Sequence, residues 1–235
     1  MEFENELIPG VLIKRYKRFF VDIKLKNKIV TAHCPNPGSM IMLLNKGNRV
    51  WVSESNNDKR KLKFTLQVIE SRNKKFCINT HITNKIILES LQKKLIDELS
   101  FYDLIKPEQK FGDSTRFDFL LTNKKENQKA FLEVKSVTLN RNGNHAEFPD
   151  AVTTRGKKHL EHLMLANRNG YKSYILFLIQ LENCETFGIA SDIDPDYSKI
   201  FKQAIKNNVN VLCYDCKFSN KGLKINKKIK IKHNE

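Results

Sequence analysis

Hydrophobic and polar residues alternate in short runs through the first third of the chain. Turn-forming residues separate the runs, most clearly Pro-Asn-Pro-Gly at residues 35–38 and Lys-Gly-Asn at residues 46–48. A period of two is typical of half-buried strands, because successive side chains point to opposite faces of a sheet. About five strands in about 80 residues predict a small barrel of the oligonucleotide/oligosaccharide-binding (OB) type, with an SH3-like barrel as the alternative. The runs cover residues 11–25, 29–34, 49–52, 62–69 and 76–80.

The pattern changes to a helical period in the second part of the chain. Ile87, Leu91 and Leu95 recur at four-residue steps and predict a helix. Hydrophobic runs and helical patterns then alternate, which indicates an α/β domain. We place the barrel at residues 1–82 and the α/β domain at residues 83–235. Predicted helices cover residues 86–99, 151–167 and 195–207, and predicted strands cover residues 108–111, 115–121, 130–135, 171–181, 209–214 and, as an edge strand, 221–232.

The predicted helix over residues 151–167 carries two signals near its start. Asp150 precedes it and is a candidate N-cap, because its carboxylate can accept a hydrogen bond from a free amide of the first turn. Gly156 lies inside the helix, where glycine costs about 1 kcal/mol relative to alanine. We therefore expect Gly156 to allow the close approach of a neighbouring element or of a phosphate.

Two of the predicted strands each contain one acid and are joined by a loop rich in Asn and Lys. Glu133 and Lys135 lie two residues apart and so share a strand face, and pairing of the strands brings Asp118 near Glu133. Buried charge is costly unless it is paired or binds a metal. The three side chains predict a Mg²⁺ or Mn²⁺ site for phosphodiester hydrolysis, with Lys135 stabilising developing charge or positioning a water. A plain cross-strand ion pair is the alternative.

The order of the elements matches restriction-endonuclease-like (PD-(D/E)xK) domains. Such domains carry an acid on the second strand and Glu-x-Lys on the third, and a following helix often adds a basic residue. Asp118, Glu133, Lys135 and Arg155 stand in those places and are the predicted catalytic residues. For the metal we expect Asp118 and Glu133 as ligands, with Glu98 of the first helix as the third.

The formal net charge of +16 favours a polyanionic partner, and nucleic acid is the commonest one. We expect DNA, with RNA as the alternative. Several basic residues stand beside aromatic ones in the barrel, a combination that suits phosphate contacts next to stacked bases. The predicted nucleic-acid-binding residues are Lys17, Arg18, Arg49, Lys59, Arg60, Arg155 and Lys158.

The five cysteines are odd in number and irregular in spacing, so no disulfide framework is predicted. Cys213-x-x-Cys216 has no second pair, and free thiols are favoured over a zinc or redox site. His159 and His162 could bind zinc together with a distant cysteine, but no second ligand pair has suitable spacing. The longest hydrophobic run has the length of a strand, so we expect a cytoplasmic protein without a membrane partner.

Four longer stretches, residues 15–19, 33–38, 131–139 and 148–160, resemble the sugar fermentation stimulation protein (SfsA) family. The resemblance extends from about residue 12 to about residue 214. It implies an N-terminal OB-type barrel joined to a nuclease-like α/β domain. It also implies DNA binding with little sequence preference and a link to the regulation of maltose metabolism in enteric bacteria.

Two functions therefore compete at this point. The first is a DNA-binding protein with little sequence preference and a regulatory role, whose nuclease-like domain is a scaffold. The second is a Mg²⁺- or Mn²⁺-dependent nuclease that acts through Asp118, Glu133 and Lys135. The three charged residues favour the nuclease, because a scaffold has no need of buried acids that face a phosphate. A sugar-binding enzyme rests on the family name and on the barrel's other class of ligand, and no residue supports it. The sequence leaves the oligomeric state open.

Overall fold

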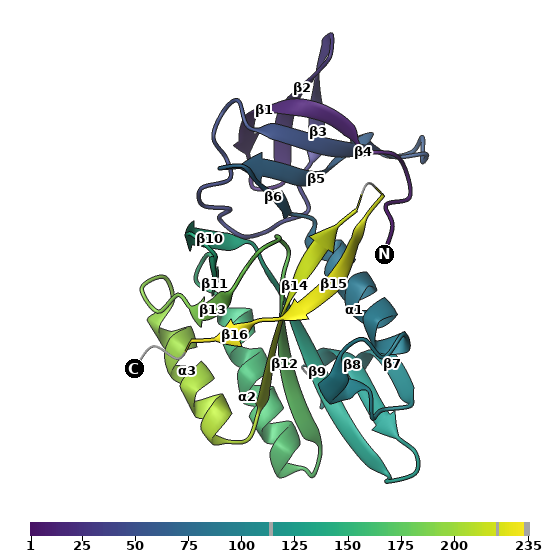
Figure 1. Ribbon diagram of the computed structural model, residues 1–235, viewed down its shortest axis with the longest axis vertical. Coiled ribbons are helices and arrows are strands. Elements are labelled where there is room, and N and C mark those ends of the chain that lie inside the picture. Colours follow the sequence, from purple (N-terminus) through teal and green to yellow (C-terminus); the bar gives the residue numbers. More distant parts are fainter. Residues whose placement is uncertain (113–114, 220, 233–235) are drawn as a thin grey trace.

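The computed structural model describes residues 1–112, 115–219 and 221–232. It has two parts, a barrel at the top of Figure 1 and an α/β domain below it. The N-terminal segment leaves the barrel and reaches the α/β domain, where Glu2 forms a β-bridge with Gly222. No helix in these ranges is long and apolar enough to cross a bilayer.

The barrel contains five strands in the order β3-β2-β1-β4-β5, and pairing of β3 with β5 closes it. Closure uses the parallel pairs Ala32↔Phe64 and His33↔Thr65. The predicted closed barrel is thus confirmed, but the predicted strand at residues 76–80 lies outside the closure, because it extends the sheet beyond β5 as β6. The strands are β1 (Ile8–Tyr16), β2 (Phe20–Leu25), β3 (Lys28–His33), β4 (Arg49–Glu54), β5 (Phe64–Ser71) and β6 (Lys74–Cys77).

The α/β domain is built on a mixed sheet in the order β15-β14-β12-β9-β8-β7. The central strands β9, β12 and β14 are parallel, and the outer strands pair antiparallel with their neighbours. Helix α1 covers one face of this sheet, and α2 and α3 cover the other. The elements are α1 (Thr83–Gln92), β7 (Leu104–Phe111), β8 (Thr115–Asn123), β9 (Gln128–Val137), α2 (Thr154–Arg168), β12 (Lys172–Ile179), α3 (Pro195–Lys206), β14 (Asn210–Phe218) and β15 (Leu223–Lys228).

A small second sheet was not predicted from the sequence. Residues 139–148, which no predicted element covers, form a hairpin that pairs with strands from much later in the chain. Arg141 fixes this hairpin through ion pairs with Glu147 and Asp192. The sheet has the order β10 (Leu139–Asn142), β11 (His145–Phe148), β13 (Thr186–Ile189) and β16 (Lys230–Ile231). The predicted C-terminal strand is therefore two strands in two different sheets.

The predicted helix over residues 86–99 is wrong at both ends. Helix α1 begins at Thr83 and stops at Gln92, and a separate 3-10 turn, η2 (Asp97–Leu99), follows. Lys94 has a left-handed backbone (φ 55°), which ends the helical run. As a result Leu95, expected on the apolar stripe, is 49% exposed.

Helix α2 starts three residues later than predicted, and its N-cap is Thr153 rather than Asp150. The Thr153 hydroxyl accepts a hydrogen bond from the Gly156 amide at 3.1 Å. Gly156 is a close-approach position, as expected: a Cβ there would lie 3.1 Å from the Tyr197 ring and closer still to Thr153. The approaching element is therefore α3 together with the cap itself.

Asp150 is not a cap because it joins the two parts of the molecule. Its carboxylate accepts a hydrogen bond from the Met40 amide at 3.0 Å, and its carbonyl accepts one from the Ser39 hydroxyl. The barrel turn at residues 36–39 is held in turn by Arg15, whose guanidinium donates to the carbonyls of Asn36 and Gly38. These bonds set the turn against the start of α2.

The end of β6 supplies a second link between the parts. The Cys77 amide donates to the Gln180 carbonyl at 2.9 Å, and the Gln180 side chain donates back to the Cys77 carbonyl at 2.8 Å. The Gln180 side-chain oxygen also accepts from the Thr83 hydroxyl at 2.6 Å. Gln180 is fully buried and follows β12. The barrel is thereby joined to the middle of the sheet and to the first residue of α1.

Candidate metal centre and active site

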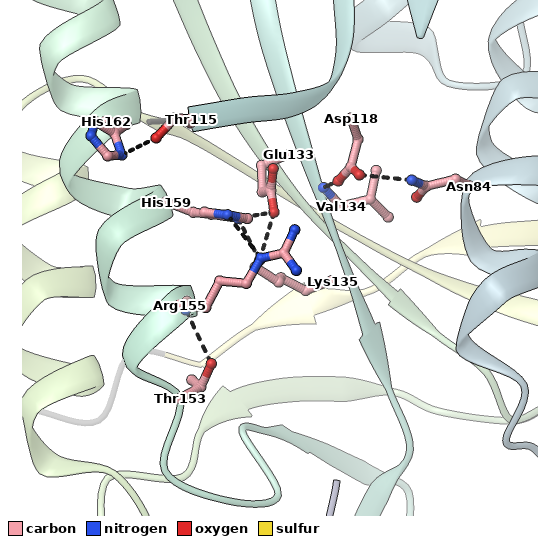
Figure 2. Close-up of polar contacts among 11 residues, drawn as sticks. Asn84, Thr115, Asp118, Glu133, Val134, Lys135, Thr153, Arg155, His159 and His162 are labelled. Atoms are coloured by element: carbon pink, nitrogen blue, oxygen red, sulfur yellow. Dashed lines mark hydrogen bonds and ion pairs between the residues drawn. The ribbon is translucent and has the colours of Figure 1, made fainter. Parts of the chain in front are cut away.

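A polar cavity of about 410 Å³ opens between α1, α2 and the middle of β9. It contains Asp118 and Glu133, with Lys135 and the first turns of α2 beside them (Figure 2). The sequence prediction that strand pairing brings Asp118 to Glu133 agrees with this arrangement. The lining residues are Thr80, His81, Thr83, Asn84, Asp118, Glu133, Val134, Lys135, Ser136, Arg155 and His159.

Glu133 is almost completely buried, with 3% of its surface exposed. Its Oε1 atom accepts a hydrogen bond from Lys135 Nζ at 2.7 Å and contacts Nδ1 of His159. Burial by itself would raise the pKa of Glu133, but Lys135 and His159 outweigh it and hold the pKa below its usual value. Its Oε2 atom is buried and has no hydrogen-bond partner among the described residues. One oxygen of an ionised carboxylate is therefore unused.

Asp118 reaches the cavity where β8 and β9 separate. Their ladder ends at the pair Phe119↔Leu132, and the Val134 amide then donates to Asp118 Oδ2 at 2.7 Å. The other oxygen, Oδ1, accepts from the Asn84 side chain at 2.7 Å. Burial first, and then the nearby charge of Glu133, raise the pKa of Asp118 to about 7.

Lys135, His159 and Arg155 form a chain of nitrogen groups on the α2 side of the acids (Figure 2). Lys135 Nζ lies 3.1 Å from His159 Nδ1, and Arg155 Nε donates to His159 Nε2 at 3.4 Å. The Lys135 side chain is 13% exposed, whereas Arg155 is exposed. His159 therefore orients Glu133, while Arg155 presents its charge at the mouth of the cavity.

The residues of this site fit a hard divalent cation. Carboxylate oxygens are the ligands that Mg²⁺ and Mn²⁺ prefer, and Mg²⁺ is commonly held by one or two carboxylates with waters and substrate phosphate completing its shell. Glu133 Oε2 and the Asp118 carboxylate supply two such oxygens. A cation there would satisfy the unpaired oxygen, whose burial otherwise costs free energy.

A tetrahedral zinc site does not fit. Within residues 1–112, 115–219 and 221–232, no group of three or more His, Cys, Asp or Glu side chains could hold a metal. His162, considered from the sequence as a partner of His159, contacts the Thr115 hydroxyl at 2.6 Å instead. The two histidines have different partners, because His162 contacts a residue of β8 and His159 contacts residues of β9.

The structure does not bring Glu98 to the acids. Glu98 accepts a hydrogen bond from the Tyr214 hydroxyl at 2.6 Å and forms an ion pair with Lys228. These partners lie on β14 and β15, away from the cavity on β9. The expectation that Glu98 is the third metal ligand is corrected, and the reason is that the predicted long helix ends at Gln92.

Asn84 is a site residue that the sequence did not predict. It lies in the first turn of α1, and the predicted helix began two residues later, at Ile86. The helix start at Thr83 points Asn84 at Asp118, as Figure 2 shows. The sequence did offer a signal: an Asn near the start of the helix that precedes the two acid-bearing strands.

The predicted nucleic-acid-binding residues are dispersed over both parts. Lys17 and Arg18 form the exposed turn between β1 and β2, and Lys59 and Arg60 lie in the exposed loop before β5. Arg49 is engaged, because its guanidinium lies 5.3 Å from the Trp51 ring and 3.9 Å from Glu70. On α2, Arg155 lines the acid cavity, whereas Lys158 lines a different hollow beside α3.

Cys213 and Cys216 are free and buried, as are the other three cysteines. Cys213 packs in the core on the α2 and α3 side of the sheet, and Cys216 packs in the core on the α1 side. Their thiols therefore point to opposite faces of β14, and the preference for free thiols at this pair is confirmed.

The fold and the site together define a class of protein, an OB barrel followed by a restriction-endonuclease-like domain. Family models match both parts: "SfsA N-terminal OB domain" over residues 13–78 and "Sugar fermentation stimulation protein RE domain" over residues 81–222. The chain belongs to the sugar fermentation stimulation protein family.

Relatives match along nearly the whole chain. The sugar fermentation stimulation protein homolog of Pelagibacter ubique is 53% identical, with 98% of this chain and 99% of the relative covered. That of Pseudoalteromonas atlantica is 42% identical, with 97% and 98% covered. The solved structure of Pyrococcus furiosus SfsA in complex with Ca²⁺ is 25% identical, with a TM-score of 0.90 over 99% of this chain and 98% of that one.

Proposed function

We propose that this protein is a metal-dependent nuclease that hydrolyses phosphodiester bonds in nucleic acid. One observation carries the proposal: beside Asp118 and Lys135, Glu133 has a buried carboxylate oxygen for which the described part of the chain offers no hydrogen-bond partner. A structural ion pair would need Lys135 and Glu133 only. It would not require a second carboxylate, Asp118, whose pKa is raised first by burial and then by the charge of Glu133.

Asp118 and Glu133 would hold Mg²⁺ or Mn²⁺, and the bound ion would supply Lewis-acid polarisation of the phosphate. Lys135 is fixed to Glu133 at 2.7 Å, so its remaining N–H donors can stabilise charge on the phosphate or orient a water. Arg155 stands exposed at the mouth and can bind a phosphate oxygen. His159 holds Glu133 Oε1, which leaves Oε2 for the cation.

The solved structure of a relative gives independent support for a divalent cation. Pyrococcus furiosus SfsA is described in complex with Ca²⁺, and its fold matches nearly all of this chain. Ca²⁺ prefers oxygen ligands, as Mg²⁺ and Mn²⁺ do. We carry cation binding over to Asp118 and Glu133 on that basis.

The test is cleavage of labelled single- and double-stranded DNA and RNA with EDTA, Mg²⁺ or Mn²⁺. Wild type should cleave only with a metal, and Glu133→Gln and Lys135→Ala should lose cleavage by at least about a hundredfold. Calorimetric titration with Mn²⁺ should show binding to wild type and none to Glu133→Gln. Cleavage that persists in Glu133→Gln, or in EDTA, would place the activity elsewhere.

The second candidate function is DNA binding with little sequence preference and a regulatory role, without cleavage. The observation that favours it is the net charge of +16 together with exposed cations on the β1–β2 turn and on the loop before β5. Absence of cleavage in every metal, with binding retained in wild type and Glu133→Gln, would select this function. Glu133 and Lys135 would then form a structural ion pair.

A further inference from the structure

Three ring side chains lie next to one another, two on the barrel and one in the turn that leads out of it. The ring centroids of Phe19 and His33 are 6.5 Å apart, and those of His33 and His81 are 6.2 Å apart. Phe19 is 41% exposed, His81 is exposed and His33 is half-buried. We call Phe19, His33 and His81 the ring row. Exposed rings contribute little to a core, so the row calls for a different explanation.

His81 connects the row to the acid cavity. His81 lines that cavity and also a larger hollow of about 660 Å³ between the barrel, the N-terminal segment and the start of α1. His33 and Arg60 line the larger hollow too. The two hollows therefore meet at His81, in the short 3-10 turn η1 (Thr80–Ile82) that leads from the barrel into α1.

Cations lie beside Phe19 and His33. Lys17 and Arg18 directly precede Phe19 in the β1–β2 turn, where both are exposed and have left-handed backbones (φ 45° and 62°). The Arg60 guanidinium donates to the Thr65 hydroxyl at 3.2 Å, and Thr65 is the strand partner of His33.

Acids also line the larger hollow, on the N-terminal segment and at one strand end of the barrel. Glu2 and Glu4 lie on the N-terminal segment, and Glu54 ends β4. Glu4 is paired with Lys85 at 3.6 Å. Arg60 is the cation of this hollow that lies beside the ring row on the barrel.

We infer that the ring row is a stacking platform that leads a single strand of nucleic acid from the barrel into the acid cavity. The inference rests on the proposed function and names its substrate class. Each ring can stack on a base only if that base has a free face, as in a single strand. Bases of a duplex are stacked on one another, so a duplex could use the cations but not the rings.

Binding of fluorescent oligo-dT of about 16 nucleotides, measured by anisotropy in EDTA, tests the platform. The parent protein is Glu133→Gln, which prevents cleavage. Phe19→Ala, His33→Ala and His81→Ala should each weaken binding by about tenfold and leave binding of a blunt-ended, two-stranded duplex unchanged. His81→Phe should restore single-strand binding, since it keeps a ring. The matched control is Phe101→Ala, because Phe101 is similarly exposed (45%) but lies by the β8–β9 turn.

Equal single-strand affinity in the parent and the three alanine variants would overturn the inference. So would equal losses on single strand and duplex, or failure of His81→Phe to restore binding. Oligo-U in place of oligo-dT separates RNA from DNA, and a ring-dependent loss on either supports the platform. If wild type cleaves nothing in Mg²⁺ or Mn²⁺ but the ring-dependent loss remains, the nuclease proposal fails and the platform stands. If wild type cleaves but the alanine variants bind single strands as tightly as the parent, the nuclease proposal stands and the platform fails.

Discussion

Asp118 is half-buried and Glu133 is almost completely buried, and their surroundings shift the proton affinities of the two carboxylic acids in opposite directions. Glu133 meets Lys135 and His159, which hold its pKa down. Asp118 meets neutral donors, the Val134 amide and Asn84, and its pKa is raised to about 7 by burial and by the charge of Glu133. A pair of acids separated in this way is typical of a functional site.

Replacement of Asp118 by Asn should stabilise the protein at high pH. The folded-state pKa of about 7 exceeds the ordinary value of 3.8, so the folded state binds the extra proton. The stability that this proton contributes is present below 3.8 and is lost as the pH rises through 7. We expect Asp118→Asn to gain about 2–4 kcal/mol relative to wild type between about pH 4 and about pH 8. Asn84 can flip its amide to suit the new partner.

Urea unfolding of wild type and Asp118→Asn at both pH values measures this difference. Added Mg²⁺ should stabilise wild type at the higher pH and leave the variant unchanged, since a ligand that binds only the folded state stabilises it. A difference in unfolding free energy that is independent of pH would contradict the raised pKa of Asp118.

His159 should act as a positioning residue for Glu133. His159→Ala removes the contact to Oε1 and the link to Arg155. We expect a loss of about ten- to hundredfold in Mg²⁺ affinity, as for other groups that orient a metal ligand. The measurement is the Mg²⁺ dependence of cleavage together with Mn²⁺ calorimetry. His162→Ala is the control on the same helix, because His162 contacts Thr115 and not the acids. Equal effects of the two variants would refute the role of His159.

At the scale of elements, the local periodicity of hydrophobic residues correctly predicted the features that depend on residues close together in the sequence. Alternation put Glu133 and Lys135 on one face, and the hairpin loop brought Asp118 opposite them. Helices α2 and α3 were predicted to within three residues, because each has a polar face and a clear hydrophobic stripe. The closed barrel followed from short strands separated by turns.

Long-range contacts explain what the sequence could not predict. Asp150 resembles an N-cap, but its bond to Met40 spans 110 positions in the chain, so Thr153 caps the helix. The left-handed turn at Lys94 releases Glu98 toward Lys228. Residues 139–148 form a hairpin because distant strands pair with them.

The bonds of Asp150 give a testable prediction about the joint between the two parts. Asp150→Ala should cost about 1–3 kcal/mol of unfolding free energy, because it leaves the Met40 amide without its partner. It should also lower cleavage, since the residue precedes the segment that carries Arg155 and His159. Urea unfolding and the cleavage assay measure the two effects. Asp196→Ala is the control, because that exposed acid pairs with Lys157 on the surface, and such a pair is worth less than about 1 kcal/mol. Equal costs in both variants would argue against a special joint.

At the scale of the whole molecule, binding of a polyanion depends on the net charge of +16 and on the placement of cations on both the barrel and the α/β domain. Lys17, Arg18 and Arg60 lie on the barrel, and Arg155 lies at the acid cavity. Barrel and α/β domain are joined by Gln180 and Asp150, so the cations on the two parts keep fixed relative positions. One polyanion can therefore contact both.

Duplex affinity should then depend steeply on salt. If about six phosphates are contacted, affinity should fall by roughly a thousandfold between 50 and 200 mM salt, because each contact releases condensed counterions. Lys17→Ala, Arg18→Ala and Arg60→Ala should each lower affinity alike on unrelated sequences and reduce the salt slope by about one, since phosphate contacts carry no sequence information. Anisotropy titrations of Glu133→Gln protein in EDTA measure both quantities. Lys206→Ala, on α3 beside a separate apolar hollow, is the control and should leave the slope unchanged. A shallow slope, or a loss confined to one sequence, would mean that the protein reads bases and does not track the backbone.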